Sequence, residues 1–159
     1  MKKVKLATFG GGCFWGVEDV YQKQEGVIDA VSGYMGGGSE SVTYEEVGGG
    51  KTGHAEVVQL VFDPETISYE GLLDIFWKIH DPTQVNKQGP DVGSQYRSVI
   101  FVHSKEQRAV AEASLEKAKR EHDDQIATQI EDSSTFHRAE DYHQNYVART
   151  GRGACHVVL

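Results

Sequence analysis

The chain of 159 residues carries a net charge of −8, with 38% hydrophobic and 25% charged residues. This length suits one domain that buries a core without disulfides, and the acidic balance argues against nucleic acid or an anionic membrane as a partner. No apolar run approaches the roughly 18 residues of a membrane helix, and the N-terminus lacks a signal-peptide pattern. We expect a monomeric, cytoplasmic protein, in which the two cysteines are catalytic or redox-active rather than a structural bridge.

Strands and helices alternate along the first half of the chain. Residues 4–9 predict a strand, residues 13–24 a helix and residues 27–34 a second strand. Residues 54–63 (HAEVVQLVFD) predict the clearest strand, because the sequence divides into two alternating sets of positions: His54, Glu56, Val58, Leu60 and Phe62, and Ala55, Val57, Gln59 and Val61. Gly26 marks the end of the first helix, whose expected inward face holds Trp15, Val17, Val20 and Tyr21.

The second half of the chain continues this alternation and has two recognisable helix starts. Ser68 precedes an apolar periodic stretch as a cap, and Ser104 with Gln107 three residues on is a capping-box signature. The expected elements are a helix after Ser68 that His80-Asp81-Pro82 ends, a polar loop over 85–94, a strand over 95–102, a helix from Ser104 to about His122, a weaker strand over 126–132, a short helix over 139–147 and a tail over 148–159.

The order of these elements indicates the fold class. They do not follow strict βαβ spacing, and no repeat or linker separates them. We therefore expect an α+β fold with helices packed on a mixed β-sheet, as a two-layer sandwich or α/β roll. Residues 1–159 form a single catalytic domain in this interpretation, with an irregular, glycine-containing tail over about 147–159.

The stretch GGGCFWG at residues 10–16 joins the first strand to the first helix. The glycines permit a tight turn that sets Cys13 in the first turn of the helix, where unpaired N–H groups and the helix dipole favour a thiolate. A small buried cysteine that packs as a hydrophobe is the alternative. Phe14 and Trp15 are either core residues or an apolar box for a small group such as a methyl.

Other functions of a glycine-rich turn lack their required residues here. No GxxxxGK[ST] phosphate loop is present, Trp15 occupies the position where the GxGxxG dinucleotide pattern needs Gly or Ala, and no CxxC occurs. The seven histidines do not show zinc-ligand spacing. We therefore expect neither a cofactor nor a metal ion.

Two further stretches are dense in site-like residues. In GGGKTGHAE, Glu56 shares a strand face with Val58 and other apolar side chains, which would raise the pKa of its carboxyl and let it carry a proton. An edge-strand glutamate facing water is the alternative. In PDVGSQYRS, Asp91, Tyr96 and Arg97 stand at a loop-to-strand junction, where sites often lie, although Asp91 and Arg97 can equally form an ion pair.

Taken in chain order, five motifs resemble those of the A-type peptide methionine sulfoxide reductases: GCFWG at 12–16, GHAE at 53–56, HDPT at 80–83, DVGSQYRS at 91–98 and EDYHQNY at 140–146. The resemblance extends from about Gly10 to Tyr146. It implies an α+β fold around a mixed sheet. It also implies reduction of the S epimer of methionine sulfoxide, free or in peptides, with thioredoxin as the usual reductant.

The resemblance assigns roles to individual residues. The matches are Cys13 for the nucleophile, Glu56 for the acid, Phe14 and Trp15 for the methyl pocket, Tyr44 and Tyr96 for the hydroxyls that bind the sulfoxide oxygen, and Asp91 for a substrate-binding acidic position. Met35 stands in SGYMGG where the family commonly has a small residue, and the tail GRGACHVVL matches no fixed family motif.

The implied chemistry fits these residue types. A sulfoxide sulfur is a poor electrophile until its oxygen is protonated or strongly hydrogen-bonded, so the site needs a thiolate, a proton donor and hydroxyl donors together. Attack leaves Cys13 as a sulfenic acid, and a second thiol can condense with it to a disulfide. We expect Cys155, the other cysteine of the chain, to be that resolving thiol.

Two other classes of function compete with this interpretation. One is a non-catalytic redox module that senses oxidation through its two cysteines and binds methionine-rich partners through Phe14 and Trp15. The other is a metal-dependent hydrolase. Turnover of methionine sulfoxide with dithiothreitol in the presence of a chelator separates all three, because only a thiol-dependent reductase consumes the sulfoxide under those conditions.

Overall fold

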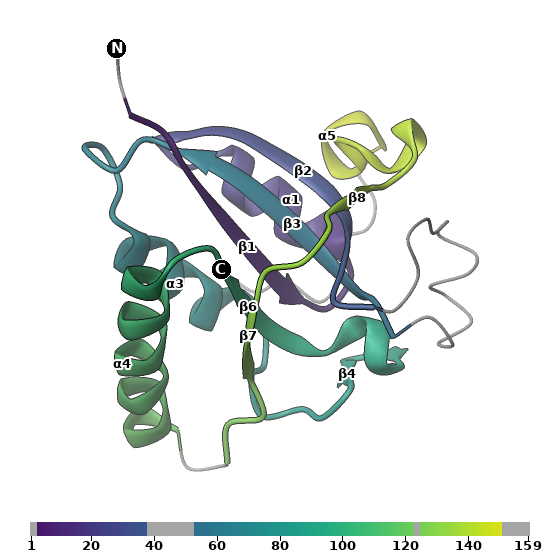
Figure 1. Ribbon diagram of the computed structural model, residues 1–159. Helices are drawn as coiled ribbons and strands as arrows, with labels where there is room; N and C mark the ends of the chain where they lie inside the picture. Colours follow the sequence, from purple (N-terminus) through teal and green to yellow (C-terminus); the bar gives the residue numbers. More distant parts are fainter. Residues whose placement is uncertain (1–2, 38–52, 123–124, 151–159) are drawn as a thin grey trace.

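The computed structural model describes residues 3–37, 53–122 and 125–150, and these form a mixed β-sheet with helices packed on it (Figure 1). In this part of the chain the main sheet has six strands, in the order β7-β6-β1-β3-β2-β8. Within it only the β6–β7 pair is parallel, which confirms the predicted mixed sheet. The strands are β1 Lys5–Gly11, β2 Val27–Met35, β3 Ala55–Phe62, β6 Ser98–Val102, β7 Gln129–Asp132 and β8 His137–Arg138.

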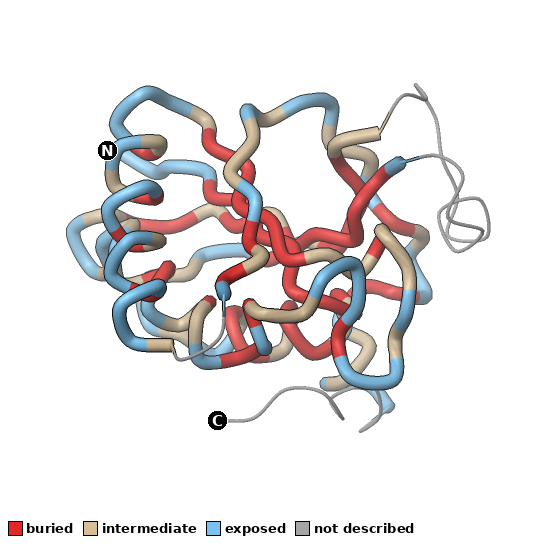
Figure 2. Tube along the Cα trace, turned by 90° about the horizontal axis from the view of Figure 1, so that it is seen from below, coloured by how far each residue is buried: buried red, intermediate tan, exposed pale blue. Residues whose placement is uncertain are grey.

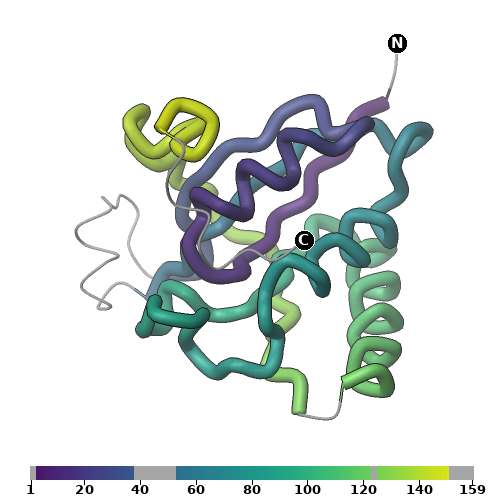
Figure 3. Tube along the Cα trace, turned by 180° about the vertical axis from the view of Figure 1, so that it is seen from behind, coloured from purple at the N-terminus to yellow at the C-terminus, as the bar shows by residue number. Residues whose placement is uncertain are grey.

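The longer helices belong to one layer that packs on the sheet. Seen from behind, α1 and α3 lie over the strands (Figure 3), and α4 packs on α3 and β6. None of the helices in the described ranges is long and apolar enough to cross a membrane. The helices and remaining short elements are α1 Phe14–Gln22, α3 Tyr69–Ile79, α4 Lys105–Glu121, the hairpin of β4 Lys87–Gln88 and β5 Asp91–Val92, the 3-10 turns η1 Ser94–Tyr96 and η2 Asp141–His143, and α5 Tyr146–Thr150.

Both predicted helix caps are confirmed. The Ser68 hydroxyl accepts a hydrogen bond of 2.9 Å from the backbone N–H three residues on, and Ser104 does the same over 3.1 Å. Gln107 departs from the capping box, because its Oε1 accepts from the backbone N–H of His103 rather than from that of Ser104. Its Nε2 donates to the carbonyl of Leu6 over 2.7 Å, which ties the start of α4 to β1.

The segment after β8 differs most from the prediction. In place of one helix over residues 139–147, the chain makes the turn η2 and then the separate helix α5, with Asn145 between them at a φ of 56°. A left-handed residue cannot continue an α-helix, so the helix is interrupted there. The expected tail over 148–159 also starts as helix, because α5 reaches Thr150.

Smaller corrections concern element boundaries. The strand expected over 95–102 begins at Ser98, because the preceding residues form η1, and the polar loop over 85–94 contains the β4–β5 hairpin. The first helix ends at Gln22, and Gly26, at a φ of 96°, lies in the turn before β2. The other adjustments are a first strand over Lys5–Gly11 in place of 4–9, a first helix from Phe14 in place of 13, and a β7 that begins at Gln129 in place of 126.

The core lies on both faces of the sheet, and Figure 2 shows the buried residues concentrated in the central segments. On the helix side, Phe9 stacks on Tyr21 and Phe76 with ring centres 5.6 and 5.3 Å apart. Burial of each such side chain contributes roughly 1.5–3 kcal/mol. On the opposite face Met35 is fully buried, so the unusual residue of SGYMGG is a core residue there. It packs in a second cluster with Ala55, Val57, Val99 and Phe101.

Candidate active site

The turn between β1 and α1 depends on its glycines in two ways. Gly12 has a φ of 91°, in the left-handed region that other residues rarely adopt. At Gly10, an added Cβ would lie 2.8 Å from Cγ1 of Val99 and 3.1 Å from the backbone oxygen of Glu56. The end of β1 can therefore approach the strand of Glu56 closely only because residue 10 has no side chain.

This turn delivers Cys13 to the N-terminus of α1. Cys13 is the N-cap, with φ −59° and ψ 126°, so it stands directly before the first turn rather than in it. Its side chain is half-buried and packs against the main core cluster. The thiol therefore lies beside the unpaired N–H groups of the helix start, which is the setting that the sequence predicts for a reactive cysteine.

Glu56 reaches the same helix terminus from the sheet. Its strand, β3, lies between β1 and β2, and the side chain is 1% exposed. Oε1 accepts a hydrogen bond of 3.2 Å from the backbone N–H of Phe14, the residue after Cys13. The alternative of an edge-strand glutamate facing water is therefore wrong.

The surroundings of Glu56 favour its protonated form. Burial raises the pKa of the carboxyl to about 8; the hydrogen bond from Phe14 opposes this shift, and the negative charge of Asp91 adds to it. Oε2 has no hydrogen-bond partner among the described residues. Because Oε1 already accepts an N–H, the proton of the neutral acid sits on Oε2. At neutral pH Glu56 is thus mainly a carboxylic acid with a transferable proton.

The two aromatic residues after Cys13 lie in different surroundings. Phe14 is 1% exposed and belongs to the main core cluster, with its ring 5.6 Å from that of Tyr34. Trp15 is half-buried, and its Nε1 donates to Nδ1 of His143 over 2.9 Å. The ring of Tyr146 stacks on Trp15 with centres 4.0 Å apart. Phe14 is therefore core that borders the site, whereas Trp15 keeps an accessible part.

The DVGSQYRS stretch lies beside the strand of Glu56. Asp91, in β5, is close enough for its charge to act on Glu56, and the turn η1 that carries Tyr96 packs against β3. Arg97 does not serve as the ion-pair partner suggested for Asp91. Its guanidinium lies 3.8 Å from Glu131 and donates to the carbonyl of Ser94.

The structure thus places Cys13, Glu56, Phe14 and Trp15 around the start of α1, with Asp91 near Glu56 and Tyr96 beside β3. Tyr44 and Cys155 lie outside the described residues. No group of three or more His, Cys, Asp or Glu side chains that could hold a metal ion occurs within the described ranges.

The chain also matches known proteins over nearly its whole length. A sequence model described as peptide methionine sulfoxide reductase matches residues 5–159. The chain belongs to the peptide methionine sulfoxide reductase family. Relatives named MsrA are 54% identical in Methanoculleus marisnigri, over 99% of this chain and 97% of that protein, and 53% identical in Methanothermobacter thermautotrophicus, over 99% and 95%.

Solved structures share the fold of this chain. The reduced form of Mxr1 from Saccharomyces cerevisiae is 41% identical, with a TM-score of 0.89 over 95% of this chain and 88% of Mxr1. Mxr1 in complex with Trx2 is also similar, at 30% identity and a TM-score of 0.64 over 91% and 85%. These likenesses confirm the predicted α+β class, with its mixed sheet and packed helices.

Sequence reasoning gave no role to two residues that contact Trp15, namely His143 and Tyr146. Both lie in EDYHQNY, which was recognised as a motif of the peptide methionine sulfoxide reductases, but no periodicity assigns them to the site. The only available signal was the density of aromatic and polar side chains in that stretch. Their contacts with Trp15 cross 128 and 131 sequence positions, which no local pattern can detect.

Proposed function

We propose that this chain reduces methionine S-sulfoxide, free or in proteins, to methionine by a thiol-dependent mechanism. Family membership over residues 5–159 supports the activity, and one observation carries the mechanism: the protonated Glu56 meets the helix terminus that presents Cys13. The reaction repairs oxidised methionine. A non-catalytic sensor is not favoured, because it has no need of a buried acid at that position.

The reductase step transfers the sulfoxide oxygen to Cys13. Glu56 donates its proton to the sulfoxide oxygen while the Cys13 thiolate attacks the sulfur, which forms a sulfur–sulfur bond and leaves the oxygen as a hydroxyl on the substrate sulfur. The hydroxyl oxygen then passes to the Cys13 sulfur as the sulfur–oxygen bond of the substrate and the new sulfur–sulfur bond both break, and methionine leaves. The substrate sulfur is reduced by two electrons, and Cys13 is oxidised to a sulfenic acid. The hydroxyls of Tyr44 and Tyr96 donate to the oxygen as charge develops on it, and Asp91 contacts the substrate.

The pocket selects what reaches the thiol. Trp15, with the edge of Phe14, offers an apolar surface that suits the methyl group of the substrate. In the S epimer the methyl group, the oxygen and the rest of the methionine side chain are arranged around the sulfur in a single configuration, which is the mirror image of that in the R epimer. A site with the methyl surface, the acid and the thiol in fixed places therefore accepts one epimer.

Cys155 completes the cycle. Its thiol condenses with the Cys13 sulfenic acid, releases water and forms a disulfide, which the dithiol of thioredoxin then reduces by exchange. The likeness to Mxr1 in complex with Trx2 supports this reductant. We place this chemistry in one catalytic domain over 1–159, with the resolving cysteine in the tail. The cytoplasmic location and the monomeric state stay predictions.

The deciding experiment supplies each sulfoxide epimer separately to the purified protein, with dithiothreitol and a chelator. The S epimer should be consumed and the R epimer left, and the Cys13→Ser variant should consume neither. Consumption of the R epimer, or turnover by Cys13→Ser within tenfold of the wild type, would contradict the proposal.

A further inference from the structure

A second buried glutamate lies one turn beyond the aromatic pair on α1. Glu18 is 1% exposed, and burial raises the pKa of its carboxyl. Oε2 accepts from the hydroxyl of Ser32 over 2.9 Å and from its backbone N–H over 3.2 Å, while Oε1 accepts from the backbone N–H of Asn145 over 2.6 Å. The chemistry of the proposed reaction does not use this carboxylate. Three donors aimed at one buried carboxyl hold it and the groups that carry those donors in place, because each would be left unsatisfied without its partner.

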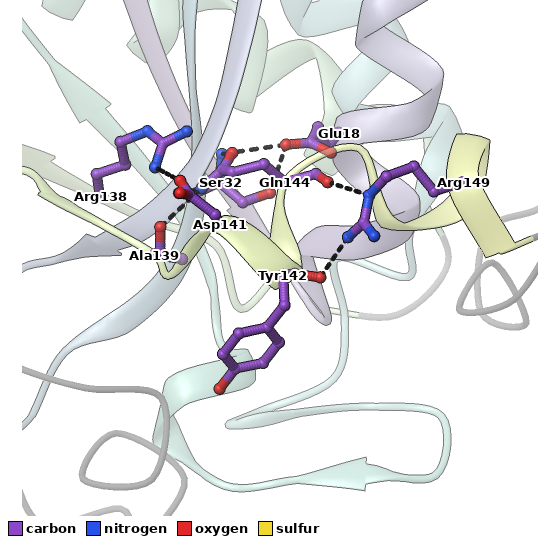
Figure 4. A network of polar contacts seen from close by, with 8 residues as sticks. All are labelled: Glu18, Ser32, Arg138, Ala139, Asp141, Tyr142, Gln144 and Arg149. Atoms are coloured by element: carbon purple, nitrogen blue, oxygen red, sulfur yellow. Dashed lines mark hydrogen bonds and ion pairs between the residues drawn. The ribbon is translucent and has the colours of Figure 1, made fainter.

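Glu18 and a neighbouring amide together hold the segment that follows β8 (Figure 4). Gln144 donates through Nε2 to the carbonyls of Ser32 and Ala139, over 2.8 and 3.0 Å, and its Oε1 accepts from the N–H of Ser32 over 3.0 Å. Arg149, near the end of α5, donates to the carbonyl of Gln144. Through these contacts of Gln144 and Asn145, the segment 139–146 is hydrogen-bonded to both α1 and β2.

One backbone position in this segment has an uncommon conformation. Asn145 adopts a φ of 56°, in the left-handed region that costs most residues other than glycine roughly 1–2 kcal/mol and that asparagine adopts more readily than they do. The backbone N–H of Asn145 donates its hydrogen bond to Oε1 of Glu18. The hydrogen bond to Glu18 therefore stabilises the one backbone position at which the segment turns toward α5.

The residues on either side of this anchor contact Trp15. His143 is 1% exposed, and its Nδ1 accepts the indole N–H over 2.9 Å while the two rings stack with centres 5.5 Å apart. The ring of Tyr146 also stacks on the Trp15 indole, with ring centres 4.0 Å apart and an interplanar angle of 13°. These two side chains leave the Trp15 indole little freedom to rotate.

The geometry points to Glu18 as a positioning residue for the reductase: it holds segment 139–146 on α1 so that His143 and Tyr146 fix Trp15 in the substrate pocket. The inference rests on the proposed function for the role of Trp15, and on the hydrogen bonds and ring stacking alone for the fixing of the ring. Glu18 acts through this segment and does not touch the reacting atoms. Cys13 and Glu56 are held by β1 and β3, so the chemical step is expected to be affected less than substrate binding.

The test compares Glu18→Ala, Glu18→Gln and the control Glu25→Ala, which removes an exposed carboxylate after the same helix. All are made in a Trp77→Phe background, because the chain has two tryptophans and only Trp15 then reports. In Glu18→Ala, Trp15 emission should move to longer wavelength and acrylamide quenching should increase. KM for a sulfoxide peptide should rise roughly tenfold, as expected for the loss of a charged hydrogen-bond acceptor, with kcat of the reductase step within threefold.

Glu18→Gln should fall between wild type and Glu18→Ala, because its amide oxygen can still accept from Asn145 while its NH2 group cannot accept from the N–H of Ser32. Glu25→Ala should change neither signal. If Glu18→Ala fails to fold, Ser32→Ala removes one bond to Glu18 and should shift fluorescence and KM in the same direction by less. Unchanged Trp15 emission and quenching in the folded variants would overturn the inference, and so would a fall in kcat with no change in KM. The fluorescence readout does not need turnover, so it judges the positioning role even if the proposed reaction fails.

Discussion

The backbone N–H of Phe14 donates a hydrogen bond of 3.2 Å to Oε1 of Glu56, across 42 positions of sequence. The bond satisfies one of the N–H groups that a helix start leaves unpaired and points the carboxyl at the end of α1 where Cys13 stands. It also leaves Oε2 to carry the proton. One backbone group therefore sets the acid in place relative to the nucleophile.

Glu56→Gln tests that acid directly. The amide keeps an oxygen for the Phe14 N–H but has no transferable acidic proton, so the reductase step should slow by roughly 100- to 10,000-fold. In the wild type, kcat/KM should fall above a pH of about 8, where burial places the pKa of Glu56. Single-turnover rates over pH 6–10 measure both effects, with Glu70→Gln on the exposed face of α3 as the control. An unchanged rate would assign the proton to the tyrosines or to water.

Glu56→Gln should also weaken the dependence of the free energy of unfolding on pH. The pKa of Glu56 is raised in the folded state, so the folded protein holds this proton more tightly than the unfolded chain does. Its contribution is fully present below the unfolded pKa, near 4.5, and is lost as pH rises to about 8. The full loss is on the order of a few kcal/mol. Denaturant unfolding at pH 6 and pH 9 should show wild type losing stability with pH and Glu56→Gln losing less.

Asp91→Asn should shift the acid without touching it. Removal of a nearby negative charge lowers the pKa of Glu56, because ionisation of the carboxyl is then opposed only by burial. The alkaline fall in kcat/KM should consequently move to lower pH, and KM should rise because the proposed mechanism places Asp91 against the substrate. The exposed Asp74→Asn on α3 should leave the profile in place. A pH profile identical to wild type would show that the Asp91 charge does not reach Glu56.

Local patterns predicted those parts of the protein that depend on local physics. Ser68 and Ser104 cap the helices that their sequence context indicates, and period-two alternation placed Glu56 on the same strand face as Val58, while the structure decides that this face is buried. The contacts that complete the site are different in kind. Glu18 meets Asn145 across 127 positions, and Trp15 meets His143 across 128. Such pairings depend on how the last segment packs on α1. In that segment the chain breaks at Asn145, where periodicity alone predicts one continuous helix over 139–147.

The difference in burial between Phe14 and Trp15 predicts different outcomes for two similar truncations. Phe14→Ala deletes a fully buried ring and should cost about 3–5 kcal/mol of unfolding free energy. Trp15→Ala removes a half-buried ring, so it should lose less stability but raise KM and lower turnover. Denaturant unfolding and steady-state kinetics on both variants measure the contrast. Loss of cooperative unfolding in Trp15→Ala would mean that its role is core packing.

Cys155→Ser tests the second half of the cycle. Tyr146 stacks on Trp15, two residues from Cys13, and α5 packs on α1. The five positions from Thr150 to Cys155 can extend up to about 17 Å, a reach that supports Cys155 as the resolving thiol. No other thiol of the chain can condense with a sulfenic acid at Cys13.

The variant should therefore complete one reductase step and stop. Mixed with excess methionine S-sulfoxide, Cys155→Ser should release about one equivalent of methionine and leave Cys13 as a sulfenic acid that dimedone traps. Thioredoxin should then fail to restore it, because no intramolecular disulfide is present for its thiolate to attack. Cys13→Ser, run in parallel, should release no methionine at all. Full thioredoxin-dependent turnover by Cys155→Ser would show that thioredoxin attacks the sulfenic acid itself, and that Cys155 has no resolving role.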